Sequence, residues 1–516
     1  MRKALLTCAV SGLLFAVACG GGGGSNNNSG GNNNSGNTGT TTIPANAPVA
    51  ECIQFLDNSY FWGSVKLADV RMGGGIGLSG TAVNVAPLYV DAGPVASTHP
   101  QVNVPFTTIQ VCVPGTSNCV TIDHVAVDTG SVGLRIPSQL LSSLNLPSVD
   151  LNSTPTSTGG TSQGSEFAGS VPIMVMGDPS IPSAPSSCST VTSISGTQKA
   201  GTEEDTVAEL GAKGLIGVGN YQYDCDVPGI STGVGSGTYG TGSNNACSPT
   251  APNTTPIAGT YYACSSSSCE STLVSGPQQI QNPVALFADD NGVILQLPSV
   301  NAGVGLASIP AGSGGSLVFG IGTQNGALNN NGLGGATVLP IDTNYNDNAW
   351  LGITTKFNNN YYPPLGTFNP NNPNAYSGYG SFFDSGSNGI YFLDTPISGI
   401  TDCASGSTAS DYFYCPTGSD VITPTPTNTA VSGGEPTGTA VAAPLTISNA
   451  NTLLGTGNTA FSDLGGPNTP GTRYIDQTAD EYFDWGLPFF YGKSVYTAIW
   501  GVTPPSGVPA GPFWAY

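Results

Sequence analysis

A short pattern that occurs twice constrains the fold of this chain more than any other feature. Each copy has an aspartate, a hydroxyl residue, a glycine and a serine, and lies between apolar segments, as in a tight turn joining two buried β-strands. The two copies are Asp128-Thr129-Gly130-Ser131 and Asp384-Ser385-Gly386-Ser387. A single copy is a weak signal, because such turns occur by chance at surfaces. Two copies, one in each half of the chain, predict two related lobes.

The composition favours strands over helices. The chain has 73 glycines and 40 prolines in 516 residues, and its apolar runs are short, β-branched and separated by turn residues, which predicts an all-β fold. The length suffices for two hydrophobic cores. We expect an N-terminal lobe at 49–305, which holds the Asp128 loop, and a C-terminal lobe at 306–516, which holds the Asp384 loop.

The N-terminus predicts export. A short basic head precedes a mostly apolar run from Ala4 to Ala18, which is too short to span a bilayer and fits a signal peptide at 1–18. Small residues end the run directly before Cys19. This arrangement resembles the cleavage and lipidation box of bacterial lipoproteins, in which Cys19 would carry the lipid. The same small residues also fit ordinary cleavage, so both outcomes stay open.

A low-complexity segment follows the signal peptide. Residues 19–48 are rich in Gly, Asn, Ser and Thr, and such a composition cannot bury a core. If Cys19 carries a lipid, we expect the segment to be a disordered tether between the lipid and the folded part of the chain. We therefore expect a protein anchored to a bacterial membrane through its lipid alone, facing the periplasm or the cell surface.

The cysteine content agrees with an exported protein. Setting aside Cys8 and Cys19 leaves an even number of the 12 cysteines, which predicts disulfides outside the cytoplasm. Closeness in sequence suggests four local pairs and leaves one longer link: Cys112 with Cys119, Cys264 with Cys269, Cys403 with Cys415, Cys225 with Cys247, and Cys52 with Cys188. With two histidines and no Cys-x-x-Cys set, we expect no metal site. We expect no cofactor either.

The charge balance limits the classes of molecule that we expect the protein to bind. The chain has 10 Lys and Arg against 31 Asp and Glu, a formal net charge of −21 at pH 7. Such a chain is repelled by phosphate backbones and anionic bilayers. We therefore expect no nucleic acid partner and no direct contact with a membrane surface, and we expect a monomer.

The two Asp loops resemble the active-site loops of pepsin-like aspartic proteases. The first loop continues into Leu134–Ser138, and the segments 213–219 and 484–490 resemble the strands that cross behind the loops in that family. The strand at 315–322 resembles the one that opens the second half. The resemblance covers most of 100–516 and implies a bilobal, double-barrel fold with a central cleft.

A closer resemblance is to an uncharacterised family of bacterial exported proteins, known as a domain of unknown function. The chain shares with it the first Asp loop and four further blocks, which are Asn282–Ala288, Phe383–Phe392, Asp484–Phe490 and Gly511–Tyr516. This second resemblance implies no activity.

The protease resemblance implies a reaction. Two carboxyl groups about 3 Å apart share one proton, so one can activate water while the other protonates a substrate carbonyl. Asp128 and Asp384 would form this pair and hydrolyse a peptide or protein held in the cleft between the lobes. The alternative is a catalytically inert binding protein of the same fold at the cell surface.

The remaining loop residues would support the pair in three ways. The glycines would allow close backbone approach, the residues after the aspartates would bond across the lobe interface, and the serines would bond the outer carboxylate oxygens. These pairs are, in the same order, Gly130 and Gly386, Thr129 and Ser385, and Ser131 and Ser387.

Two features depart from the protease pattern. Arg135 stands where those enzymes have an aromatic residue; it either pairs with an acidic side chain or indicates a different cleft. The segment after the first loop also lacks the tyrosine of the flap, the hairpin that closes over the substrate. A flap-like segment precedes the loop at 51–75, with Tyr60 and Trp62 as flap candidates. The competing interpretation is an extra hairpin in which both are core aromatics.

Overall fold

The computed structural model describes most of the chain beyond the N-terminal segment. The described residues are 43–54, 59–95, 100–192, 198–224, 261–272, 274–326, 329–341, 352–362, 380–404, 413–432, 435–467 and 482–516. The signal peptide, Cys19 and most of the tether lie outside them, as do Cys225 and Cys247. Within these ranges the protein is mostly β, as expected. The α-helices are single turns: α1 (Ser138–Leu141), α2 (Ser186–Ser189), α3 (Val207–Leu210), α4 (Thr395–Ser398), α5 (Ala450–Leu454) and α6 (Leu487–Phe490).

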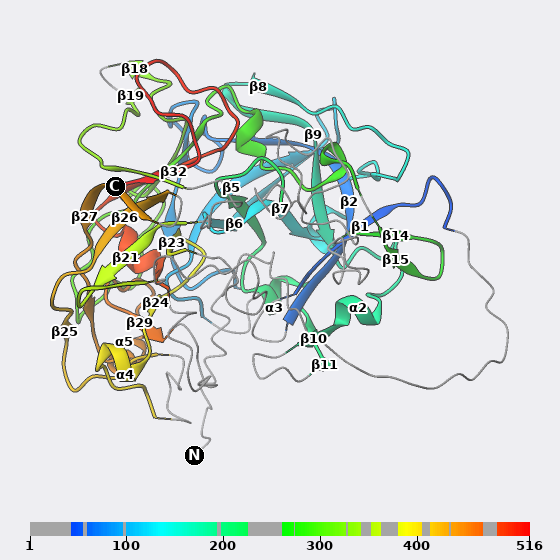
Figure 1. Cartoon of the computed structure of the whole chain (residues 1–516). Coiled ribbons are helices and arrows are strands. Elements are labelled where there is room, and N and C mark those ends of the chain that lie inside the picture. The colour runs from blue at the N-terminus through cyan, green and yellow to red at the C-terminus, as the bar shows by residue number, and fades with distance from the viewer. Residues whose placement is uncertain are drawn as a thin grey trace.

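Six strands of the first half close into a barrel. Each pairs with the next in the order β2, β5, β6, β13, β7 and β9, and β9 returns to β2. The strands are β2 (Ser59–Met72), β5 (Pro105–Cys112), β6 (Cys119–Asp128), β13 (Gly214–Val218), β7 (Val132–Pro137) and β9 (Ser165–Met176). In Figure 1 they occupy the centre and right of the view. Strand β6 ends at Asp128, so the barrel fixes the position of the first Asp loop.

Short strands extend the barrel at several edges. They are β1 (Val49–Gln54), β4 (Tyr89–Val90), β8 (Thr158–Ser162), β12 (Thr202–Glu203), β14 (Tyr261–Cys264) and β15 (Cys269–Ser271). Strand β1 pairs with both β2 and β14. A separate ribbon joins β10 (Thr190–Thr192) to β11 (Gln198–Ala200).

The segment considered as a flap is part of the barrel wall. Most of β2 pairs with β9 from Gly63 to Met72, and its end also pairs with β5. A strand hydrogen-bonded on both sides is not free to open and close as a lid. The Tyr60 hydroxyl donates to Glu203, and the Trp62 indole N–H donates to a backbone carbonyl. Both rings are buried in an apolar cluster around the Cys52–Cys188 disulfide. This placement replaces the flap interpretation with that of core aromatics.

A six-stranded sheet combines strands from the whole chain. Its order is β20-β32-β31-β16-β17-β3. The bounds are β3 (Val85–Pro87), β16 (Gly292–Gln296), β17 (Ser316–Phe319), β20 (Val338–Pro340), β31 (Ser494–Ala498) and β32 (Phe513–Ala515). The segment expected to be a strand at 315–322 supplies β17. Because β3 precedes the barrel strand β5 and β32 ends near the C-terminus, this sheet ties the two halves together.

Two smaller sheets belong to the second half and lie on the left in Figure 1. The first has the order β23-β30-β24-β29, with β23 (Phe382–Asp384), β24 (Ile390–Phe392), β29 (Gly465–Pro467) and β30 (Asp484–Gly486). The second has the order β22-β21-β26-β27, with β21 (Thr354–Phe357), β22 (Asn360–Tyr362), β26 (Thr427–Ser432) and β27 (Glu435–Ala442). Two-stranded ribbons join β18 (Asn325–Gly326) to β19 (Asn329–Asn330), and β25 (Asp420–Val421) to β28 (Thr446–Ile447).

The largest apolar cluster extends across both halves. It includes barrel residues and residues of the second-half sheets, among them Val127 and Phe383, which directly precede the two aspartates and are fully buried. Burial of this kind is the main favourable contribution to folding. The two Asp loops are therefore attached to one continuous core.

Four disulfides confirm the expected pairs that fall within the described ranges. They are Cys52–Cys188, Cys112–Cys119, Cys264–Cys269 and Cys403–Cys415. The first spans 136 residues and holds β1 to α2.

The fifth expected pair is not among the confirmed disulfides. Cys225 and Cys247 both lie outside the described residues, so the bond between Cys225 and Cys247 stays a prediction.

In the part of the chain that the structure describes, none of the helices is both long and apolar enough to cross a bilayer.

Candidate active site

Each Asp loop is threaded by a crossing strand in the same way. In the first half β13 lies between β6, to which it is parallel, and β7, to which it is antiparallel. In the second half β30 lies between β23 and β24 with the same two directions. Gly217 is opposite Asp128, and Gly486 is opposite Asp384. The repeat seen in the sequence is therefore a repeat of local topology.

Both crossing strands require glycine beside the aspartate. A Cβ at Gly217 would lie 2.4 Å from the Val132 amide nitrogen, and one at Gly486 would lie 2.0 Å from the Gly389 carbonyl oxygen. Real side chains do not tolerate such contacts, so the backbones approach closely only because the Cβ is missing. The apolar-Gly pattern of 213–219 and 484–490 thus has a direct steric cause.

The two loops are joined by reciprocal hydrogen bonds. The Thr129 amide donates to Ser385 Oγ at 3.1 Å, and the Ser385 amide donates to Thr129 Oγ1 at 2.9 Å. Each hydroxyl also donates to the opposite strand, from Thr129 to the Phe383 carbonyl at 3.0 Å and from Ser385 to the Val127 carbonyl at 2.8 Å. All four bonds are buried, where an unmade bond is expensive. They hold the two loops face to face.

This arrangement brings the two aspartates together. The Gly130 amide donates to Asp128 Oδ1 and the Gly386 amide to Asp384 Oδ1, both at 2.7 Å. A Cβ at Gly386 would lie 2.7 Å from Asp128 Oδ1 and 3.0 Å from Asp384 Oδ1. The glycines therefore leave just enough room for two neighbouring carboxyl groups. Both aspartates are 0 % exposed.

The two loop serines differ, contrary to the symmetric expectation. Ser387 Oγ lies 2.9 Å from Asp384 Oδ2, as expected. Ser131 Oγ and Asp128 Oδ2, in contrast, have no hydrogen-bond partner among the described residues. Ser131 is tied to the crossing strand by its backbone, because its carbonyl accepts from the Gly219 amide at 2.8 Å. The two halves of the site are therefore not equivalent at their serines.

A third carboxyl group, which the sequence did not single out, belongs to the site. Asp484 Oδ2 lies 2.6 Å from Ser387 Oγ, so one hydroxyl contacts both Asp384 and Asp484. A serine hydroxyl has a single proton to donate. Both contacts can be hydrogen bonds at the same time only if one of the two carboxyl groups is itself protonated. The sequence signal for it is an acidic residue between Phe483 and Trp485, in an otherwise apolar segment.

Electrostatics agree with protonated carboxyl groups at this site. Burial, followed by the charges of Asp128 and Asp484 and a hydrogen bond with Asp128, raises the pKa of Asp384 well above its usual range, although the Gly386 amide opposes this. The pKa of Asp484 is also raised well above its usual range, mainly by burial. The hydrogen bond with Ser387 opposes this increase, and the charge of Asp128 adds to it. Neighbouring carboxyl groups in an apolar site cannot all ionise. The cluster therefore holds at least one proton well above the pH at which a free aspartate loses it.

Arg135 pairs with acidic side chains, which is the first of the two expectations for it. It is buried, and its guanidinium lies 2.8 Å from Glu51 Oε1 and 3.5 Å from Asp224 Oδ2. The Tyr261 hydroxyl lies 2.8 and 2.9 Å from the two oxygens of Asp224, between which its one proton is shared, and it accepts from the Ile280 backbone amide. This charge network ties β7, next to the first loop, to β1 and β14.

A second carboxyl pair lies away from the Asp loops. Burial, followed by a hydrogen bond with Asp289 and the charge of that residue, raises the pKa of Glu166 to about 8. The Ala288 backbone amide donates to Glu166 Oε2 at 2.8 Å, and the side-chain Nε2 of Gln324 donates to both oxygens of Asp289 at 3.0 Å. No sequence motif indicated this pair, because its members are far apart in the chain.

The family match of this chain covers the residues of the site described above. No curated protein matches the chain. A protein family described as "Protein of unknown function (DUF3443)" matches residues 31–79, 80–257 and 230–516. These ranges include the barrel, both Asp loops and both crossing strands. The chain belongs to this family of unknown function.

Proposed function

We propose that this protein is an aspartic endopeptidase that hydrolyses peptide bonds with a water molecule activated by Asp128 and Asp384. The observation that carries the proposal is the face-to-face pair of Asp loops, held together by the reciprocal bonds of Thr129 and Ser385. A purely structural turn would not need two buried carboxyl groups beside each other, because burying them costs free energy. Functional sites are where such a cost is retained.

The chemistry follows from proton sharing. In the ground state one carboxyl group of the pair is ionised and the other holds the proton. The ionised group takes a proton from water, which attacks the peptide carbonyl, while the protonated group donates to the carbonyl oxygen. The pair titrates as a unit, so neither role belongs to one residue. The outer oxygen of Asp128, which has no partner among the described residues, is a suitable acceptor for the water.

The same observations support a pepsin-like arrangement of the chain. A closed barrel in the first half, an identical threading of both Asp loops and a sheet shared by both halves favour two lobes at 49–305 and 306–516. In this proposal a peptide or protein substrate binds in a cleft between the lobes. We further propose a monomer that is exported and anchored to a bacterial membrane by a lipid on Cys19.

One observation favours a second candidate, an inert binding protein of the same fold at the cell surface. Both Asp128 and Asp384 are completely buried, and a substrate has to reach their oxygens. For the endopeptidase, the site has to open before a peptide binds. For the inert protein, the pair remains closed and serves only to join the two loops.

The experiment that separates these candidates is digestion of a peptide library across a range of pH. The endopeptidase predicts cleavage by the wild type and none by Asp384→Asn. Asp420→Asn is the matched control, because Asp420 is an exposed acid on β25. Absence of cleavage by the wild type at every pH would favour the inert protein. Equal cleavage by all three proteins would assign the activity to another site.

A further inference from the structure

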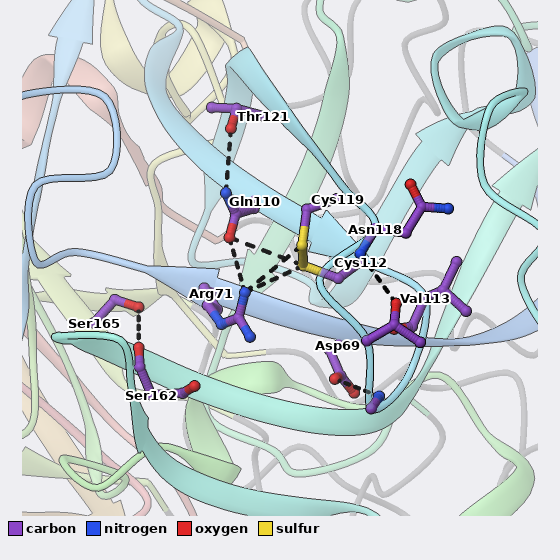
Figure 2. The surroundings of a disulfide bond; sticks show 12 residues. Asp69, Arg71, Gln110, Cys112, Val113, Asn118, Cys119, Thr121, Ser162 and Ser165 are labelled. Atoms are coloured by element: carbon purple, nitrogen blue, oxygen red, sulfur yellow. Dashed lines mark hydrogen bonds between the residues drawn. A yellow bond between two sulfur atoms is a disulfide. The ribbon is translucent and has the colours of Figure 1, made fainter.

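A buried guanidinium lies against one of the disulfides. Arg71, on β2, places its Nη1 3.3 Å from Cys112 Sγ and 3.7 Å from Cys119 Sγ. Figure 2 shows the guanidinium pointing at the Cys112–Cys119 bond, with Gln110 beside it. Gln110 Oε1 accepts from the same nitrogen at 2.9 Å. The guanidinium also faces the Phe167 ring, 5.5 Å from its centroid.

This positive charge has no carboxylate partner among the described residues. Arg71 is only 5 % exposed, and its Nε also has no hydrogen-bond partner there. Asp69, the nearest acid along β2, is turned elsewhere: its oxygens accept from the Gly115 and Ser170 amides at 2.9 and 2.8 Å. A buried charge without a counter-ion is costly. An anion formed at Cys112 or Cys119 would compensate it.

The two sulfurs differ in access. Cys112 is fully buried, whereas Cys119 is partly exposed and follows an exposed turn at 115–118. The guanidinium is closer to the buried sulfur than to the accessible one. An external thiolate can therefore approach Cys119, and the sulfur that leaves is the one beside the positive charge. Thiol–disulfide exchange is fastest when the attacked sulfur is accessible and the leaving thiolate is stabilised.

We propose that the Cys112–Cys119 disulfide is a site of thiol–disulfide exchange with an external thiol or dithiol. A thiolate attacks Cys119 Sγ, a bond forms between these two sulfurs, and the Cys112–Cys119 bond breaks. Cys112 Sγ takes the electron pair as a thiolate next to the Arg71 guanidinium. A second external thiolate then attacks the external sulfur of the mixed disulfide and releases Cys119, which takes a proton from water. The external thiols are oxidised to a disulfide, and the cysteine pair is reduced.

The chain contains its own control for this proposal. Cys264 and Cys269 face each other across the β14–β15 hairpin as Cys112 and Cys119 do across β5 and β6. Among the described residues, Arg71 donates to the sulfurs of Cys112 and Cys119, and no arginine or lysine makes such a hydrogen bond to Cys264 or Cys269. The two disulfides thus share a cross-strand setting and differ in two respects: the guanidinium, and access, because Cys264 and Cys269 are both buried whereas Cys119 is partly exposed.

Differential alkylation tests the proposal directly. The folded protein is treated with dithiothreitol for increasing times, free thiols are alkylated, and each cysteine is quantified by mass spectrometry. We expect Cys112–Cys119 to be reduced about tenfold faster than Cys264–Cys269, because its leaving thiolate is stabilised. Arg71→Met should slow the reduction of Cys112–Cys119, because the leaving thiolate loses its cation, and should leave the Cys264–Cys269 rate unchanged. Equal rates for the two disulfides in the wild type would overturn the proposal.

A second measurement does not depend on whether Arg71→Met folds. Cys119→Ser leaves a single Cys112 thiol beside Arg71, and Cys112→Ser leaves Cys119 alone. The pH dependence of alkylation should have its midpoint at least about one pH unit lower for Cys112 than for Cys119, because a neighbouring cation favours the thiolate. A mixed disulfide formed with glutathione in the wild type should be found on Cys119. Coincident midpoints, or glutathione on Cys112, would contradict the proposal.

Discussion

Thr129 and Ser385 exchange hydrogen bonds between the two Asp loops, each hydroxyl accepting from the backbone amide of the other residue. Because each hydroxyl also donates to the carbonyl that precedes the opposite aspartate, the two residues fix how the strands ending in Asp128 and Asp384 meet. The geometry of the carboxyl pair therefore depends on two hydroxyl side chains that lie beside it.

Removing one of these hydroxyls should destabilise the protein. Ser385→Ala leaves the Thr129 amide and the Val127 carbonyl buried without their partner, and we expect a loss of about 2–4 kcal/mol in the free energy of unfolding. Thr129→Ser keeps the hydroxyl and is the matched control, with a loss of less than about 1.5 kcal/mol from the missing methyl group. Urea denaturation measures both. A loss no larger for Ser385→Ala than for Thr129→Ser would show that the reciprocal bonds contribute little.

Asp484 should make the stability depend on pH. A raised pKa means that the folded protein keeps a proton that the unfolded chain releases. This contribution is complete below the unfolded pKa of about 4 and is lost as the pH rises through the folded pKa. Asp484→Asn lacks the titration and keeps a neutral side chain beside Ser387. Its free energy of unfolding relative to the wild type should rise between pH 4 and pH 8, by about 1 kcal/mol or more.

The control for this comparison is Asp420→Asn, which removes an exposed acid of β25. Its stability relative to the wild type should hardly change over the same pH range. If the difference between Asp484→Asn and the wild type is also constant with pH, Asp484 is ionised in the folded protein, and the proton that Ser387 requires lies on Asp384.

The carboxyl pair of Glu166 and Asp289 predicts a second pH effect with a defined window. The pKa of Glu166 is raised to about 8, so its contribution to stability is complete below pH 4 and is lost as the pH rises from there through 8. Glu166→Gln should therefore be more stable than the wild type at pH 9 by about 2 kcal/mol and differ less at pH 5. Thermal or urea unfolding at both pH values measures this, and a larger gain at pH 5 would contradict the assignment.

Much of the site could be predicted because local sequence determines it. The Asp loops, their crossing strands and the disulfides within the described ranges depend on motifs with steric or covalent requirements, such as the glycines opposite Asp128 and Asp384. Arg135 was expected to pair with an acid, but sequence could not name Glu51, because the pairing depends on how β1 packs on the barrel.

The features that sequence missed depend on long-range pairing. The alternation at 51–75 fits a hairpin lid and a barrel strand equally well, and only the pairing of β2 with β9 and β5 distinguishes them. In the sequence, Asp484 is only the first residue of a mostly apolar segment, because its contact with Ser387 requires β30 to lie between the strands of the second loop. Glu166 and Asp289 meet for the same reason, across segments that are distant in the chain.

The proposed anchor depends on the thiol of Cys19. If a lipid is attached there, Cys19→Ala should shift the protein from the membrane fraction to the soluble fraction or leave it unprocessed, because lipid attachment needs the sulfur. Immunoblots of fractionated cells measure this. Membrane association that is the same in wild type and variant would mean that a lipid on Cys19 does not hold the protein at the membrane.

The central claim is that Asp128 and Asp384 hydrolyse peptide bonds, and the most direct test is the kcat/KM for one peptide substrate found by library digestion. Asp128→Asn and Asp384→Asn should each lower kcat/KM at least about a thousandfold while the thermal midpoint remains close to that of the wild type. The wild type should show a bell-shaped pH profile, and Asp420→Asn should match it. A kcat/KM that is unchanged in both dyad variants would contradict the claim.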